Sequence, residues 1–173
     1  ILVTNDDGIA APGLHVLARE LAALGEVTII APDREQSASS HALTLHRPLR
    51  VNRQGEPVYS VHGTPTDCVN LGILNLLTER PRLVVSGINR GMNLGDDITY
   101  SGTVAAAFEG TLLGIPSFAI SQEVENGEEA FDRAAGVAPR PVVGEERGAE
   151  RVPHRHHVVP VDQLAGGAAV DGE

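Results

Sequence analysis

The first residues of the chain, Ile1 to Gly8 (ILVTNDDG), constrain its fold more than any other stretch. An apolar, β-branched run leads directly into two adjacent carboxylates, Asp6 and Asp7, which indicates a buried parallel strand that delivers both acids to its carboxyl end. Ligands bind at that end of strands in open α/β sheets. Adjacent carboxylates repel each other, so a cation between them and a substrate is one interpretation. The alternative is a plain Asp-rich turn in which Asp6 caps the next helix.

The pattern that follows predicts an α/β fold with a parallel sheet. Apolar residues at helical spacing predict a helix over residues 12–24, and residues 26–31 (EVTIIA) predict a second buried strand. This succession is a right-handed βαβ unit. Further strands are expected at residues 82–86 and 117–121, with a helix at residues 104–113 between them.

A helix start is also predicted at residues 63–67 (GTPTD). Thr64 suits the N-cap, Pro65 the first helical position, and Asp67 completes a capping box. The single cysteine, Cys68, is expected in the core of this helix rather than as a nucleophile. The predicted apolar face comprises Leu71, Ile73, Leu74, Leu76 and Leu77.

Polar segments follow the predicted strands, at the edge where Asp6 and Asp7 are expected. Residues 32–45 offer hydroxyl and imidazole groups, although a solvated loop is the alternative for this composition. Residues 87–97 form a second such loop, which is rich in glycine, Asn and Asp. The candidate ligands or phosphate donors of the first loop are Ser37, Ser39, Ser40 and His41, and the second loop carries Asn89, Asn93, Asp96 and Asp97.

The start of the helix at residues 101–103 (Ser-Gly-Thr) is a candidate anion site. Free backbone N–H groups and hydroxyls at a helix N-terminus favour binding of a phosphate. The alternative is an ordinary N-cap formed by Ser101.

Composition restricts the partners. The formal net charge is −10 and all 13 basic residues are arginine, which argues against binding of a nucleic-acid polymer. A small phosphate can still be held by backbone amides and a metal. No apolar run is long enough to span a bilayer and a lone cysteine fits a reducing compartment, so a cytoplasmic protein without membrane contact is expected.

Five motifs, in order along residues 1–122, resemble those of the SurE (survival protein E) family of metal-dependent nucleotidases. They are VTNDDG (3–8), APDREQSASSHALT (31–44), GTPTDCV (63–69), VSGINRGMNLGDD (85–97) and YSGTVAAAFEG (100–110). The resemblance implies a Rossmann-like parallel sheet with helices on both faces, a three-layer sandwich. It also implies homodimers or homotetramers, and hydrolysis of nucleoside 5′- and 3′-monophosphates and sometimes of short polyphosphate.

The same resemblance implies one divalent cation per subunit, held by Asp6, Asp7, Ser37 and Asn89. These are hard oxygen donors, which suit Mg²⁺ or Mn²⁺ better than zinc. We expect a metal-activated water to attack, oriented by Asp7, with a phospho-aspartyl intermediate as the alternative. The groups expected to hold the phosphate are Asn93, Ser101, Gly102 and Thr103.

The end of the chain departs from this pattern. Residues 134–173 contain one leucine, four prolines, six glycines and no Ile, Phe, Tyr or Met. We therefore expect a nucleotidase domain at residues 1–133 and an atypical, disordered segment at 134–173, with the family likeness fading after Arg133. A gene read out of frame and a lineage-specific tail are the two explanations.

Two other functions compete with a nucleotidase. A nucleotide-phosphate binder with little or no turnover would result if the shortened end removes necessary scaffold. A Rossmann-like dehydrogenase ranks last, because no GxGxxG follows the first strand and NDDG puts charge where a pyrophosphate would lie.

Overall fold

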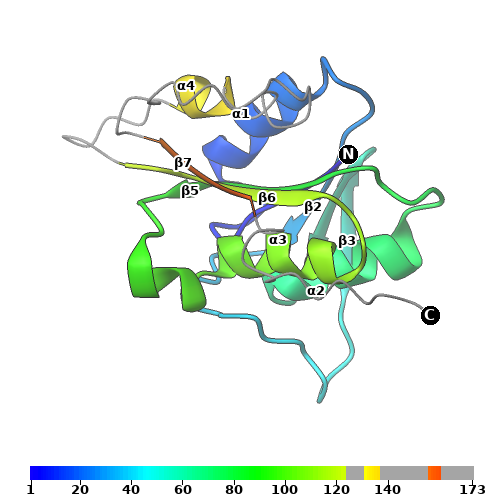
Figure 1. Ribbon diagram of the computed structural model, residues 1–173. Coiled ribbons are helices and arrows are strands. Elements are labelled where there is room, and N and C mark those ends of the chain that lie inside the picture. Colours follow the sequence, from blue (N-terminus) through cyan, green and yellow to red (C-terminus); the bar gives the residue numbers. More distant parts are fainter. Residues whose placement is uncertain (124–130, 137–155, 161–173) are drawn as a thin grey trace, which may run out of the picture.

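A single mixed β-sheet with helices on both faces forms the framework of the computed structural model (Figure 1). The structure describes residues 1–123, 131–136 and 156–160. Its strands are β1 (Leu2–Thr4), β2 (Thr28–Pro32), β3 (Val51–Gly55), β4 (Val58–Val61), β5 (Val84–Arg90), β6 (Ser117–Gln122) and β7 (His156–Pro160). Its helices are α1 (Pro12–Leu21), α2 (Pro65–Leu71), the π-helix η1 (Gly72–Leu76), the 3₁₀-helix η2 (Gly95–Thr99), α3 (Gly102–Leu112) and α4 (Phe131–Ala135).

The strand order is β3-β4-β2-β1-β5-β6-β7, which puts β1 in the middle of the sheet. The strands from β4 to β6 run parallel, and only the outer strands β3 and β7 run antiparallel to their neighbours. Leu2 and Val3 are both fully buried, because the β1 side chains alternate between two covered faces. The predicted α/β Rossmann-like fold is confirmed, with β5 extending to Arg90, beyond the predicted Ser86.

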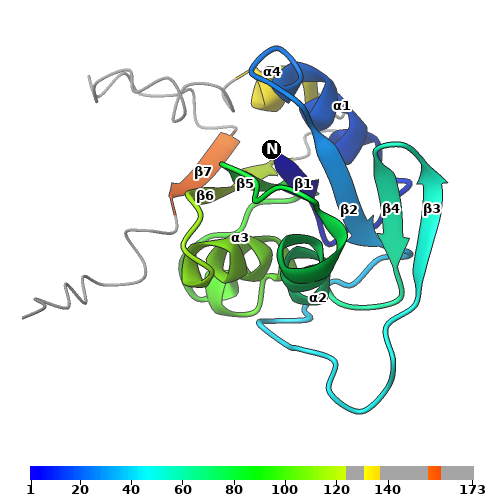
Figure 2. The same ribbon diagram turned by 90° about the vertical axis from the view of Figure 1, so that its right-hand side faces the viewer.

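Helices cover the sheet on opposite sides, and each side has its own apolar core (Figure 2). α1 and α4 pack on one face around Val3 and Val85, whereas α2 and α3 pack on the other around Leu2 and Val84. α1 ends at Leu21, earlier than the predicted Leu24. None of the helices in the described ranges is long and apolar enough to cross a membrane.

The predicted start of α2 is confirmed in atomic detail. The Thr64 hydroxyl accepts a hydrogen bond from the Asp67 N–H, and the Asp67 carboxylate accepts one from the Thr64 N–H. Cys68 is a buried core residue, as expected. The predicted apolar face was only partly right, because the chain continues into the π-helix η1 and leaves Leu74 58% exposed.

The segment expected to lack regular structure contains some. α4 reaches Ala135, and β7 pairs antiparallel with β6. The expectation for residues 134–173 is therefore wrong at these two places. A proline at the end of β7 is compatible with its place as an outer strand among the described residues. Residues 137–155 and 161–173 lie outside the described residues, so the boundary after Arg133 stays a prediction.

Asp67 also joins α2 to the loop that follows β2. Its carboxylate, which is 2% exposed, accepts hydrogen bonds from the Thr44 N–H at 2.8 Å and the Thr44 hydroxyl at 2.6 Å, besides the one from the Thr64 N–H. The loop that carries Ser37 is thereby fastened to the second helical layer.

We expect Asp67→Ala to lower the free energy of unfolding by about 3 kcal/mol, because three half-buried donors lose a buried charged acceptor. Urea unfolding measures this. Asp96→Ala, at an exposed position in η2, is the control and should change stability by less than about 0.5 kcal/mol. Equal losses in the two variants would contradict this role of Asp67.

Candidate functional site

The site begins where β1 ends. Asn5 closes the turn after the strand, since its Nδ2 donates to the Gly8 carbonyl at 3.1 Å and its Oδ1 accepts from the Gly8 N–H at 3.2 Å. Gly8 has a φ of 96°, and a Cβ there would lie 2.9 Å from the backbone of Arg34. Only glycine fits this turn without strain. Asp6 and Asp7 are therefore held at the carboxyl end of the middle strand.

Asp6 lies against the N-terminus of α3. Its Oδ2 accepts from the Thr103 N–H at 3.1 Å, and its Oδ1 accepts from the Thr103 hydroxyl. Gly102 permits this approach, because a Cβ on it would lie 2.6 Å from Ser39 Oγ and 3.0 Å from Asp6 Cβ. The positive end of the helix dipole thus faces a carboxylate that is 5% exposed.

Asp7 is less buried than Asp6, and its Oδ2 accepts from the Arg90 N–H at 3.2 Å. Burial, and after it the charge of the adjacent Asp6, raise the pKa of Asp7 to about 6, although the hydrogen bond from the Arg90 N–H opposes this. Burial also raises the pKa of Asp6, although the bonds from Thr103 oppose this. The fold therefore holds two carboxyl groups where ionising both is unfavourable, which is a condition that a cation relieves.

Asn89 enters the site through an irregularity in β5. The register with β6 shifts between Ser86 and Asn89, and a Cβ on Gly87 would lie 2.4 Å from the Ile120 carbonyl oxygen. Such bulges redirect side chains next to functional sites. The Asn89 Nδ2 donates to the Gly91 carbonyl at 2.8 Å, so Oδ1 is the atom of this side chain that could bind a cation.

Ser37 comes from the loop after β2. The Gln36 N–H donates to the Asp6 carbonyl at 2.7 Å, which ties this loop to the end of β1. The Ser37 hydroxyl donates to Glu35 Oε1 at 2.6 Å, so its hydrogen is committed and its oxygen keeps its lone pairs.

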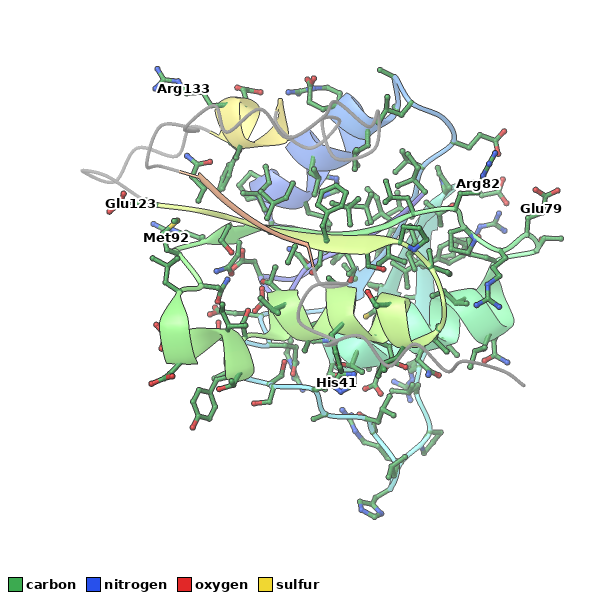
Figure 3. The ribbon with its side chains drawn as sticks, viewed as in Figure 1. His41, Glu79, Arg82, Met92, Glu123 and Arg133 are labelled. Carbon is green, nitrogen blue, oxygen red and sulfur yellow. The ribbon has the colours of Figure 1, made fainter. Side chains whose placement is uncertain are left out.

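A second fastening of the same loop uses a buried acid of α3. Glu109 is 5% exposed and accepts from the Asn70 Nδ2 at 2.8 Å, and the His41 Nε2 lies 2.8 Å from its other oxygen. Figure 3 shows His41 on the loop segment below α3. His41 therefore serves the structure of the loop and is not a ligand at the cavity.

These segments surround a cavity of ≈ 340 Å³. The structure brings six of the predicted site residues to its wall: Asp6, Asp7, Ser37, Asn89, Asn93 and Ser101. Gly102 and Thr103 are not among the lining residues and lie behind Asp6. Asp97, a candidate of the second loop, also lines the wall, and the prediction missed four other lining residues: Glu35, Ala38, Arg90 and Tyr100.

The phosphate candidates have other partners here. The Asn93 Nδ2 donates to Ser121 Oγ at 2.6 Å, and the Ser101 hydroxyl accepts from the Val104 N–H at 3.2 Å, as an N-cap does. Thr103 gives both of its donors to Asp6. Their role toward a phosphate stays a prediction, whereas the contacts with Asp6 and the cap are observed.

A metal ion in this cavity would be bound by few charged side chains. In the part of the chain that the structure describes, no group of three or more His, Cys, Asp and Glu side chains could hold one. Two carboxylates, a hydroxyl and an amide oxygen are nevertheless available at the cavity wall. This donor set fits Mg²⁺ or Mn²⁺, since Mg²⁺ is commonly bound by one or two carboxylates and keeps several waters.

The hydrogen bonds from Thr103 to Asp6 lead to a prediction in which Thr103 supports cation binding, in place of the phosphate binding expected from the sequence. Thr103→Val removes the hydroxyl but keeps the N–H, and should weaken Mn²⁺ binding by about 10-fold because Asp6 loses its orienting partner. Thr103→Ser is the matched control and should bind Mn²⁺ like the wild type. Calorimetric titration with Mn²⁺ measures both. An unchanged Mn²⁺ affinity in Thr103→Val, with a higher KM for AMP, would favour the phosphate role instead.

The chain matches the family model described as Survival protein SurE over residues 1–163. This match continues beyond Arg133, where we expected the likeness to fade, and the domain boundary at that residue stays a prediction.

Two curated relatives carry the name 5′-nucleotidase SurE. The one from Citrifermentans bemidjiense is 59% identical over 140 residues, which is 81% of this chain and 56% of the relative. The one from Geotalea daltonii is 67% identical over 121 residues, which is 70% of this chain and 49% of the relative. The chain thus spans about half the length of these relatives.

A solved structure is also similar. The crystal structure of the SurE protein from Aquifex aeolicus superposes with a TM-score of 0.77 at 46% identity, covering 82% of this chain and 58% of that one.

Proposed function

Because the chain belongs to the survival protein SurE family, we propose that it is a divalent-metal-dependent phosphohydrolase that releases phosphate from nucleoside 5′- and 3′-monophosphates, and from short polyphosphate. One observation carries the proposal. Oxygen-bearing side chains from three separate segments, namely Asp6 and Asp7, Ser37, and Asn89, line the same cavity at the carboxyl ends of parallel strands.

In this proposal Asp6, Asp7, Ser37 and Asn89 hold one Mg²⁺ or Mn²⁺ ion. When bound, the ion supplies Lewis-acid polarisation of a phosphoryl oxygen and a lower pKa for water. Asp6 and Asp7 then have different roles. Asp6 has both oxygens engaged by Thr103, so it is suited to a fixed ligand role. Asp7 is more exposed than Asp6, and its Oδ2 accepts a hydrogen bond from the Arg90 N–H. This exposure suits Asp7 to orient an attacking water.

The charge of the cavity wall supports metal dependence. Four acidic residues face one basic residue, Arg90, among the described residues of the wall: Asp6, Asp7, Glu35 and Asp97. A phosphate dianion that enters such a cavity is repelled unless a cation offsets the carboxylates. Asn93 and Ser101 supply neutral polar groups on the same wall.

We expect EDTA to abolish phosphate release from AMP, and added Mg²⁺ or Mn²⁺ to restore it. Phosphate release is measured colorimetrically, and AMP binding is measured separately by calorimetry. Full activity in metal-free buffer would contradict the metal dependence. AMP binding without phosphate release, in the presence of either ion, would favour the alternative of a nucleotide-phosphate binder.

The ligand assignment has its own test. Asp6→Asn keeps the shape of the side chain but removes a charge. It should lower kcat/KM for AMP by at least about 100-fold, because even the loss of a residue that only orients a metal ligand costs up to about that much. Asp132→Asn, whose side chain is 81% exposed on α4, is the control and should retain activity. Wild-type turnover and Mn²⁺ affinity in Asp6→Asn would remove Asp6 from the site.

A further inference from the structure

Glu35 was not among the predicted site residues, yet the structure places it on the cavity wall in contact with one of them. The Ser37 Oγ donates to Glu35 Oε1 at 2.6 Å. Between the two, the Gln36 N–H is bonded to the Asp6 carbonyl at 2.7 Å. Both side chains are exposed, but the backbone between them is fixed relative to the end of β1.

The direction of this hydrogen bond matters for what Ser37 can do. A hydroxyl presents its oxygen to a cation only when its hydrogen points elsewhere. The Glu35 carboxylate accepts that hydrogen, and a charge-assisted O–H bond of this length is a strong one. A cation on the oxygen makes the hydroxyl a better donor, so cation binding and the bond to Glu35 strengthen each other.

Glu35 does not group with Asp6 and Asp7 as a three-carboxylate metal site. The described residues hold no group of three or more His, Cys, Asp and Glu side chains that could bind a metal ion. Its Oε1 is already the acceptor for Ser37. Glu35 thus has two remaining ways to act on a cation: through Ser37, or through space by its charge.

We propose that Glu35 is a positioning residue that turns the Ser37 hydroxyl oxygen toward the divalent cation and so strengthens cation binding. This inference rests on the proposed function, because it needs Ser37 to be a ligand. It assigns to Glu35 a role in cation affinity that is separate from any contact with the nucleotide.

A double-mutant cycle with Mn²⁺ as the probe tests the proposal. We expect Glu35→Ala to weaken Mn²⁺ binding by about 10- to 100-fold. If Glu35 acts through Ser37, then Glu35→Ala has little further effect in a Ser37→Ala background, so the two losses are strongly non-additive. Calorimetric titration of the full chain gives the four dissociation constants without any activity measurement.

Two further variants separate orientation from charge. Asp97→Ala removes a carboxylate from the same wall, and its smaller effect measures the through-space contribution alone. Glu35→Gln keeps an acceptor oxygen for Ser37 and should recover part of the affinity lost in Glu35→Ala. A merely structural role of Glu35 would not produce this order.

Three results would overturn the inference. The first is an unchanged Mn²⁺ affinity in Glu35→Ala, the second is additive losses in the cycle, and the third is an equal loss in Asp97→Ala. Each of these, with normal Mn²⁺ binding by the wild type, leaves the proposed function intact. If the wild-type chain binds neither Mn²⁺ nor Mg²⁺, the metal site itself is wrong and both proposals fail together.

Discussion

The repulsion between Asp6 and Asp7 is the interaction around which this structure is arranged. Two neighbouring carboxyl groups lie at the end of the middle strand, and burial raises the pKa of both. The fold compensates with donors: the N-terminus of α3 reaches Asp6 through Thr103, and the backbone of Arg90 reaches Asp7. Gly102 is required because any side chain there would separate the helix from the acid.

The site also depends on the loop after β2, which must hold Ser37 near Asp6 and Asp7 although the loop lacks regular structure. It is fastened at separate points to three parts of the fold. Gln36 bonds to the end of β1, His41 lies against Glu109 of α3, and Thr44 bonds to Asp67 of α2. Each fastening involves a group whose partner is distant in the sequence, so two helices of the same layer, α2 and α3, and the central strand contribute to the position of one hydroxyl.

Local chemistry explains which features could be predicted. The buried strands were visible as apolar β-branched runs, and the α2 capping box was visible because Thr64 and Asp67 are three residues apart. The contact between Asp6 and Thr103 spans 97 residues, and no local pattern encodes it. The bulge before Asn89 and the pairing of β7 with β6 likewise depend on tertiary packing. Glu35 and Arg90 lay within quoted motifs, next to predicted ligands, and charge at those positions was the signal that was overlooked.

The central position of β1 has a consequence for how the chain acquires its site. β1 pairs with β2 and with β5, so its neighbours come from segments that are synthesised later, and a nascent chain that ends before β5 lacks one wall of the cavity. Strand pairings between residues so far apart in the sequence form late, because the entropy of loop closure is lost before the new contacts stabilise the chain. A ligand that requires all three segments binds only the completed fold, and at 100 times its dissociation constant it would stabilise that fold by about 2.7 kcal/mol. Occupancy of the site would then report on the completion of folding as well as on catalytic readiness.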